Sequence, residues 1–236
     1  MNVMAEDKNA EDKAKLVERE YQDFVYTVSH DLNAPLRHVK EFTKLLIGNR
    51  EDNLTQEEQE YVHFINQSLQ RIDDMQNALL TFSRLNTRHN PKTKININDI
   101  VQSIVEDVDT QGVEIVCDKM PVILADVDQI RLLFHHLIVN AIKFHKDHAF
   151  GKRVFIDVQK IRGGWSFEII DNGIGMTEKQ CQDAFRPFKR FDPERYDGIG
   201  MGLTIAQKIV RSHGGEISIE PRGNGGTMVR FSLKKN

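Results

Sequence analysis

Residues 21–46 read YQDFVYTVSHDLNAPLRHVKEFTKLL, a run in which apolar side chains recur at steps of three and four residues. That spacing places them on one face of an α-helix. The apolar positions are Tyr21, Phe24, Val28, Leu32, Val39, Phe42 and Leu46. The pattern predicts a long amphipathic helix that begins near Val17 and ends near Gly48 and Asn49.

A second helix start follows at Thr55, whose hydroxyl can cap the helix while Glu58 closes the capping box. Its apolar stripe continues to about Asn86, through Tyr61, Ile65, Leu69, Ile72, Leu79, Phe82 and Leu85. Two long helices with a short connection form an antiparallel hairpin, and one hairpin leaves apolar surface that another can cover. We expect a homodimeric four-helix bundle. The alternative is a monomeric hairpin packed on the rest of the chain.

The pattern changes after Asn90 and Pro91 from long helices to short mixed elements. We expect strands at residues 94–98, 113–118, 122–125, 153–161, 165–171, 216–220 and 227–233, and helices at residues 99–109, 127–146 and 201–212. Turn signals at residues 162–164 and 223–226 favour hairpins, and hence a mixed sheet covered by helices on one face rather than a doubly wound parallel sheet. The expected domains are a lead-in at residues 1–13, a helical dimerisation domain at 14–90 and an α/β domain at 91–236.

Composition argues against several classes of protein. With 39% hydrophobic and 28% charged residues the chain resembles an ordinary soluble protein, and its net charge of -3 gives no electrostatic case for a nucleic-acid partner. Cys117 and Cys181 lie far apart in sequence, which supports neither a disulfide framework nor a structural zinc site. No apolar run approaches the roughly 20 residues that span a bilayer. We expect a cytoplasmic chain without membrane contact of its own, although a longer parent protein could be anchored.

His30 stands within the first predicted helix, in the run Ser29 to Leu36. At 100° per residue it lies about 160° from both Val28 and Leu32, so it faces away from the apolar stripe. Pro35 removes a helical hydrogen bond and should kink the helix, at a cost of about 3 kcal/mol. A plain bundle helix has no reason to bear this cost, so the kink beside His30 suggests a functional site. On these residues alone, a solvated surface histidine remains the alternative.

Three further motifs contain groups suited to a phosphate-bearing ligand. Asn140 and Lys143 share one helix face, so an amide oxygen for a hard cation and an ammonium for a phosphate point together. Asp171 ends an apolar strand, where its carboxylate can accept a hydrogen bond from an exocyclic amino group such as that of adenine. Glycines follow it, and a second glycine cluster precedes a helix whose N-terminus can bind an anion. These residues are Gly173, Gly175, Gly198, Gly200, Gly202 and Leu203.

A loop between these two glycine clusters, including Phe185 to Asp192, contains aromatic and basic residues and no clear periodicity. A segment of about 25 residues without obvious structure in a compact domain is typical of a functional lid.

In this order and spacing, the motifs resemble the conserved core of two-component sensor histidine kinases over about residues 15–233. The H box lies at His30, the N box at Asn140, the G1 box at Asp171, the F box at residues 185–191 and the G2 box at residues 198–203. The H box is most similar to those of kinases with PAS, GAF or phytochrome-type sensors. The resemblance implies an α plus α/β fold, in which a helical hairpin forms a dimeric four-helix bundle and is followed by a Bergerat-type α/β sandwich with a mixed sheet.

The resemblance also implies the chemistry. His30 in its neutral form would attack the γ-phosphate of ATP, and Asp31 would orient the ring and accept its proton. Arg190 would steady the γ-phosphate during transfer. Asn140 would bind Mg²⁺. The remaining nucleotide contacts would come from Lys143, Phe144, Asp171, Gly173, Gly175, Gly198, Gly200, Gly202, Leu203 and Thr227.

The resemblance further implies a response-regulator receiver domain as partner. Two departures from the family pattern matter. His136 stands four residues before Asn140, where many relatives have a second asparagine, and an imidazole nitrogen suits Mg²⁺ poorly. Ala34 stands where relatives with strong phosphatase activity have a polar residue that holds water, so we expect weak phosphatase activity.

Three functions compete on this sequence. An ATP-dependent histidine kinase is favoured by the intact H, N and G1 boxes. A catalytically degenerate dimeric scaffold that docks a regulator or partner kinase is the alternative that His136 supports. An ATPase related through the nucleotide fold alone is disfavoured by the hairpin around His30. His145 and His148 have metal-ligand spacing, but a polar helix end is the preferred interpretation.

Overall fold

The computed structural model describes residues 32, 35–45, 47–48, 54–85, 90–145, 151–223 and 225–235. The chain divides into two compact units, Met1–Thr87 and Arg88–Asn236, and each is described by itself. Within the described residues, no helix combines the length and apolar character needed to cross a membrane.

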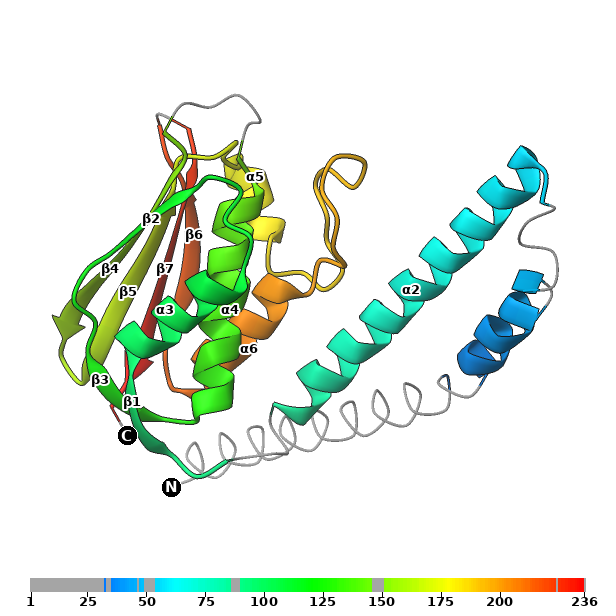
Figure 1. Ribbon diagram of the computed structural model, residues 1–236. Helices are drawn as coiled ribbons and strands as arrows, with labels where there is room; N and C mark the ends of the chain where they lie inside the picture. The colour runs from blue at the N-terminus through cyan, green and yellow to red at the C-terminus, as the bar shows by residue number, and fades with distance from the viewer. Residues whose placement is uncertain are drawn as a thin grey trace, which may run out of the picture. The chain divides into compact units, whose positions relative to one another are not determined.

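The first unit is helical. Residues 35–45 are helical, and α2 spans Gln56–Arg84 (Figure 1). The predicted capping box starts α2, because the Glu58 amide donates to the Thr55 hydroxyl at 3.2 Å and the Thr55 amide donates to the Glu58 carboxylate at 2.8 Å. An ion pair between Lys40 and Asp73 joins the two helices. The helical hairpin expected from the apolar pattern is confirmed.

The second unit is an α/β domain (Figure 1). Its elements in chain order are β1 Thr93–Asn96, α3 Ile97–Asp107, β2 Glu114–Cys117, β3 Val122–Ala125, α4 Val127–Lys143, β4 Arg153–Ile161, β5 Gly164–Asp171, α5 Glu178–Asp183, α6 Gly202–Ser212, β6 Ile217–Pro221 and β7 Thr227–Lys234. Five strands form a sheet in the order β2-β4-β5-β7-β6. The β2–β4 pair is parallel and the other three pairs are antiparallel, which confirms the mixed sheet.

Helices α4 and α6 cover one face of this sheet, and the core of the domain lies between them and the strands (Figure 1). Phe134 of α4 is fully buried and packs edge-on against Phe167 of β5 and Phe231 of β7, with both pairs of ring centroids 5.5 Å apart. Burial of three phenylalanines at this density contributes several kcal/mol, at about 25 cal/mol per Å² of apolar surface. This packing fixes α4 against the middle of the sheet.

The structure differs from the predicted elements in four places. Helix α4 ends at Lys143 rather than at residue 146. Helix α3 begins at Ile97 rather than Asp99, because the Asn96 side chain caps it by accepting from the Asn98 amide at 3.2 Å. Strands β1 and β3 pair with each other in a separate two-stranded sheet. The segment predicted to lack regular structure contains α5, whose start is a capping box formed by Thr177 and Gln180.

Candidate active site

A cavity of about 560 Å³ opens beside α4 in the second unit. It is bounded by α4, the ends of β5 and β7, the first turn of α6 and the lid loop, by which we mean residues 185–201. The structure brings together in its lining Asn140, Lys143, Phe144, Asp171, Gly175, Arg190, Gly198, Gly200, Gly202, Leu203 and Thr227. Eleven predicted residues, from four motifs and the last strand, therefore share one cavity.

Asp171 lies at the base of this cavity, 8% exposed, at the end of β5. Its Oδ1 accepts from the Gly173 amide at 2.8 Å and from the Thr227 amide at 3.2 Å. Its Oδ2 receives no hydrogen bond from the described residues. Burial raises the pKa of Asp171, while these amides and the nearby His145 and Arg222 oppose the rise. One oxygen thus serves the fold and the other stays available to a donor in the cavity.

Gly173 lies behind the cavity wall rather than in it. A Cβ on Gly173 would come within 2.1 Å of the Phe144 carbonyl oxygen, to which the Ile174 amide donates at 2.8 Å. A Cβ on Gly226 would come within 2.0 Å of the Asp171 carbonyl oxygen. The backbone after β5 therefore lies pressed between the end of α4 and the start of β7, which only glycine permits at these positions.

Two cations and an aromatic pair lie at the lid side of the cavity. Lys143, Arg190 and Asp197 all line the cavity. Burial lowers the pKa of Lys143, while Asp197 opposes this shift and Arg190 adds to it. The Arg190 guanidinium donates to the carbonyls of Pro193 at 2.8 Å and Tyr196 at 2.5 Å. The Tyr196 ring meets the Phe144 ring edge-on, with centroids 4.9 Å apart. The lid loop thus rests on the C-terminal end of α4.

His136 faces the first turn of α6. A Cβ on Gly202 would lie 3.3 Å from its Nδ1, so glycine leaves room for the ring. Its Nε2 is buried and has no hydrogen-bond partner among the described residues. Burial, with a smaller contribution from His135, lowers the pKa of His136 to about 4, so the ring is neutral near pH 7.

Two family models match the chain. Residues 20–88 match the model described as His Kinase A (phospho-acceptor) domain. Residues 125–236 match the model described as Histidine kinase-, DNA gyrase B-, and HSP90-like ATPase. The chain belongs to the histidine kinases.

Similar proteins share this kinase core. Cyanobacterial phytochrome B of Nostoc sp. is 34% identical over 224 residues, which are 92% of this chain and 30% of the relative. Phytochrome-like protein Cph1 of Synechocystis sp. is 29% identical over 237 residues, which are 96% of this chain and 31% of the relative. The crystal structure of full-length ShkA in complex with AMPPNP has a TM-score of 0.67 at 24% identity, and the match covers 89% of this chain and 45% of that one.

These comparisons confirm the histidine kinase resemblance, including its phytochrome-linked relatives, and the α plus α/β fold class. The kinase core spans less than a third of the length of the phytochromes it matches. His30, Asp31 and Ala34 fall within the phospho-acceptor match but lie outside the described residues. Their roles, like those of the cavity residues, remain predictions.

Several contributors to the cavity region were not predicted from the sequence, and three of them are polar or charged side chains close to the predicted site. Tyr196 and Asp197 line the cavity, and Arg222 donates to the Asp171 carbonyl at 3.4 Å. An aromatic residue two positions before the first G2 glycine was the available signal for Tyr196. Nothing local marked Arg222, because β6 and β7 bring it to Asp171 from 51 residues away.

Proposed function

We propose that this chain is an ATP-dependent protein histidine kinase core, which phosphorylates its own His30 and passes the phosphoryl group to an aspartate of a response-regulator receiver domain in the cytoplasm. The supporting observation is the cavity, which is lined both by Asp171, whose Oδ2 receives no hydrogen bond from the described residues, and by the glycine-rich start of α6. An adenine amino group can donate to Asp171 Oδ2. The phosphates can then reach Lys143 and the amides at the first turn of α6, which has no side-chain cap.

Magnesium fits this site with one protein oxygen. The Asn140 side chain lines the cavity and offers an amide oxygen, whereas the nearby His136 offers a softer nitrogen. Asn140 would therefore be the protein residue that holds Mg²⁺. When bound, the ion offsets negative charge on the phosphates.

The transfer step is proposed as follows. A neutral imidazole nitrogen of His30 forms a bond to the γ-phosphorus, the bond from that phosphorus to the ADP oxygen breaks, and Asp31 accepts the imidazole proton. Arg190 lies on the lid loop and lines the cavity, a place from which its guanidinium can stabilise the transferring group. The Phe144 ring would lie against the nucleotide, with Gly173 and Gly175 at one hinge of the lid loop, Gly198, Gly200 and Gly202 at the other, and Leu203 and Thr227 in the wall.

We further propose that the chain acts as a homodimer through residues 14–90, with the catalytic domain at 91–236 and a lead-in at 1–13. Side chains of the predicted apolar stripe are exposed in the single chain, at 64% for Phe42, 48% for Val39 and 43% for Ile65. A second hairpin would cover them in a four-helix bundle. Phosphatase activity towards the regulator is proposed to be weak, because alanine at position 34 offers no group to hold water.

Incubation with γ-labelled ATP and magnesium tests the proposal, with His30→Gln as the matched variant. Acid-labile, alkali-stable label on the parent and none on the variant is the expected result. ATP binding without label on either protein would favour the second candidate, the degenerate scaffold. His136 supports that candidate, since its Nε2 has no hydrogen-bond partner in the described part of the chain. Label that persists in His30→Gln would overturn the assignment of His30.

A further inference from the structure

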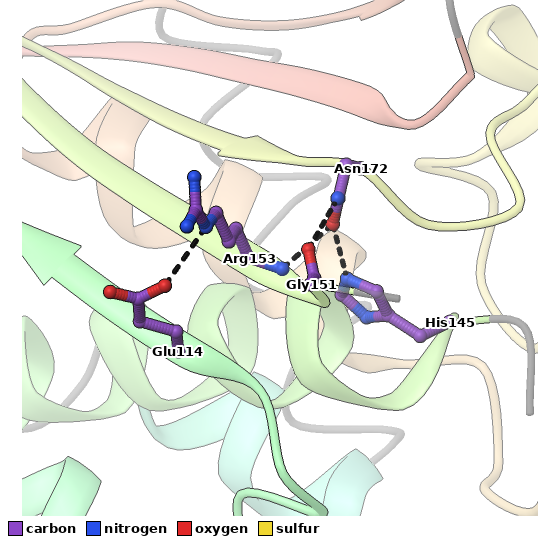
Figure 2. Close-up of polar contacts among 5 residues, drawn as sticks. All are labelled: Glu114, His145, Gly151, Arg153 and Asn172. Atoms are coloured by element: carbon purple, nitrogen blue, oxygen red, sulfur yellow. Dashed lines mark hydrogen bonds and ion pairs between the residues drawn. The ribbon is translucent and has the colours of Figure 1, made fainter. Parts of the chain in front are cut away.

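The His136 ring contains a buried atom that the fold leaves unpaired. Among the buried side-chain nitrogen and oxygen atoms of the described residues, only Nε2 of His136 has no hydrogen-bond partner. The buried His145, just beyond the end of the same helix, shows the usual case. Its Nδ1 lies 3.1 Å from the Ile142 carbonyl oxygen and its Nε2 lies 3.0 Å from the Asn172 side-chain oxygen (Figure 2). Because buried polar atoms are normally paired, the exception in a binding cavity needs an explanation.

The place of His136 along α4 puts its ring at the phosphate end of the cavity. His136, Asn140 and Phe144 follow one another at steps of four residues, and all three line the cavity. The carbonyl of Phe144 accepts from the Ile174 amide, beside the proposed adenine position at Asp171. Eight residues of helix are about 12 Å long. His136 therefore lies about 12 Å along the axis from the adenine end, beside the first turn of α6.

Other hydrogen-bond donors gather at this end of the cavity. Nδ1 is the ring nitrogen beside Gly202, since a Cβ on that glycine would lie 3.3 Å from it. Gly202 is the first residue of α6, whose first turn has no side-chain cap, so its amides are available to an anion. The ammonium of Lys143 lines the same cavity, 3.2 Å from where a Cβ on Gly198 would lie. A hydrogen on Nδ1 would add a further donor to these groups.

The buried Nε2 indicates which ring nitrogen carries that hydrogen. Burial keeps the ring neutral near pH 7, so it has one N–H and one lone pair. An N–H that is buried without an acceptor is rarer in folded proteins than an acceptor with an unused lone pair. The favoured ring therefore has its lone pair on Nε2 and its hydrogen on Nδ1. A nitrogen that carries hydrogen cannot bind a metal ion, but it can donate to a phosphate oxygen.

We propose that His136 is a substrate-binding residue that donates from Nδ1 to an oxygen of the β- or γ-phosphate, and so helps the kinase core to distinguish ATP from nucleotides with shorter phosphate chains. This inference rests on the proposed ATP-binding function. Asn140 remains the proposed ligand of Mg²⁺. The imidazole would bind the phosphate chain directly, alongside Lys143 and the amides of α6.

Two substitutions at this position differ in whether they keep the donor. Asparagine branches at Cγ as the imidazole does, so His136→Asn can place an N–H where Nδ1 lies. His136→Leu branches at the same carbon but has no donor, and it removes the unpaired nitrogen from the interior. His135→Asn is the matched control, because His135 lies on the same helix, is exposed and does not line the cavity.

The measurement is the pair of dissociation constants of AMPPNP and AMP, each with magnesium, by NMR titration. Partial unfolding of a variant weakens both ligands by the same factor, so the ratio of the two constants reports contact with the terminal phosphates. We expect His136→Leu to bind AMPPNP about tenfold more weakly, about 1.4 kcal/mol, with AMP unchanged. His136→Asn should recover most of this loss, and the ratio for His135→Asn should equal that of the wild type.

Two spectroscopic readouts use the wild type labelled with ¹⁵N in its histidines, and so do not depend on the variants folding. Near pH 7 the ring resonances of His136 should show hydrogen on Nδ1. Pulsed EPR of the complex with AMPPNP and Mn²⁺ should show no histidine ¹⁵N bound directly to the metal. Hydrogen on Nε2, a metal-bound ¹⁵N, or an unchanged AMPPNP-to-AMP ratio in His136→Leu would overturn this inference and leave the proposed function intact. Failure of the wild type to bind AMPPNP would overturn both.

Discussion

Replacing Asp171 by asparagine tests whether the two oxygens of its carboxylate have separate roles, one in the fold and one in ligand binding. The substitution preserves the size of the side chain. Its Oδ1 can still accept from the Gly173 and Thr227 amides, which are 2.8 Å and 3.2 Å away in the wild type. The change falls on the other oxygen, where an NH₂ donor replaces the acceptor proposed to receive the adenine amino group.

The expected loss of affinity follows from the bond removed and the donor left behind. A hydrogen bond to a charged acceptor contributes about 1.5 to 3 kcal/mol, and a buried donor facing another donor adds to the deficit. A total loss of about 3 kcal/mol in binding free energy corresponds to a roughly 10²-fold larger dissociation constant for AMPPNP.

Stability should change in the opposite direction. Burial raises the pKa of Asp171, so the folded protein binds this proton more tightly than the unfolded chain does. Stability associated with this group is therefore present at low pH and is lost as the pH rises through the raised pKa. Asparagine has no charge to bury. At neutral pH the ligand-free Asp171→Asn protein should unfold at the same temperature as the wild type or a higher one.

Calorimetric titration with AMPPNP and thermal unfolding of the ligand-free protein measure the two effects. Asp118→Asn is the matched control, since Asp118 directly follows strand β2, is exposed and does not line the cavity. Unchanged affinity in Asp171→Asn would refute the assignment of Oδ2 to the ligand. A clear fall in the unfolding temperature would refute the inference that the buried, ionised carboxylate of Asp171 destabilises the ligand-free fold.

Three further predictions concern the packing of the site, the buried histidine and the dimer. Gly173→Ala, whose Cβ would lie 2.1 Å from the Phe144 carbonyl oxygen, should lower the free energy of unfolding by about 1 to 3 kcal/mol in denaturant titration, whereas Gly223→Ala, with open space around it, should not. Burial lowers the pKa of His136 to about 4, so the stability that comes from its neutral ring is fully present above pH 6.5 and is lost as the pH falls towards 4. This loss amounts to at most about 3 kcal/mol. His136→Leu, which cannot be protonated, should be correspondingly less destabilised by acid in unfolding titrations. Phe42→Ser, at a side chain 64% exposed in the single chain, should weaken dimerisation about tenfold or more in sedimentation equilibrium, and an unchanged association constant would argue against the bundle.

Local signals predicted the elements whose boundaries are set by neighbours in sequence. The start of α2 depends on Thr55 and Glu58, three residues apart, and both were identified as a capping box. A capping box also starts α5, at Thr177 and Gln180, but this segment was predicted to be part of an irregular lid because of the aromatic residues that follow it. At Asn96 two local tendencies compete, since the residue both ends β1 and caps α3, and periodicity alone does not decide between strand and cap.

Long-range contacts lay beyond sequence reasoning. Asn140, Lys143 and Phe144 share one helix, so their common direction could be predicted from spacing. The bond from the Thr227 amide to Asp171 joins residues 56 positions apart and exists only because β5 and β7 pair. The pairing of β1 with β3 likewise joins residues far apart in sequence, such as Thr93 and Ala125.

The position of Asp171 couples the site to the folding of the sheet. Its carboxylate is held by one amide from the turn that follows β5 and by one from the first residue of β7, so the geometry offered to a ligand requires both the β5–β7 pair and the glycine turn. His145 and Phe144 add a third support from the end of α4. A ligand that donates to Oδ2 therefore stabilises the sheet, the turn and the helix end together, because binding to the folded form alone shifts the equilibrium towards all three. The same linkage should make nucleotide affinity sensitive to residues that act on the carboxylate only through these supports.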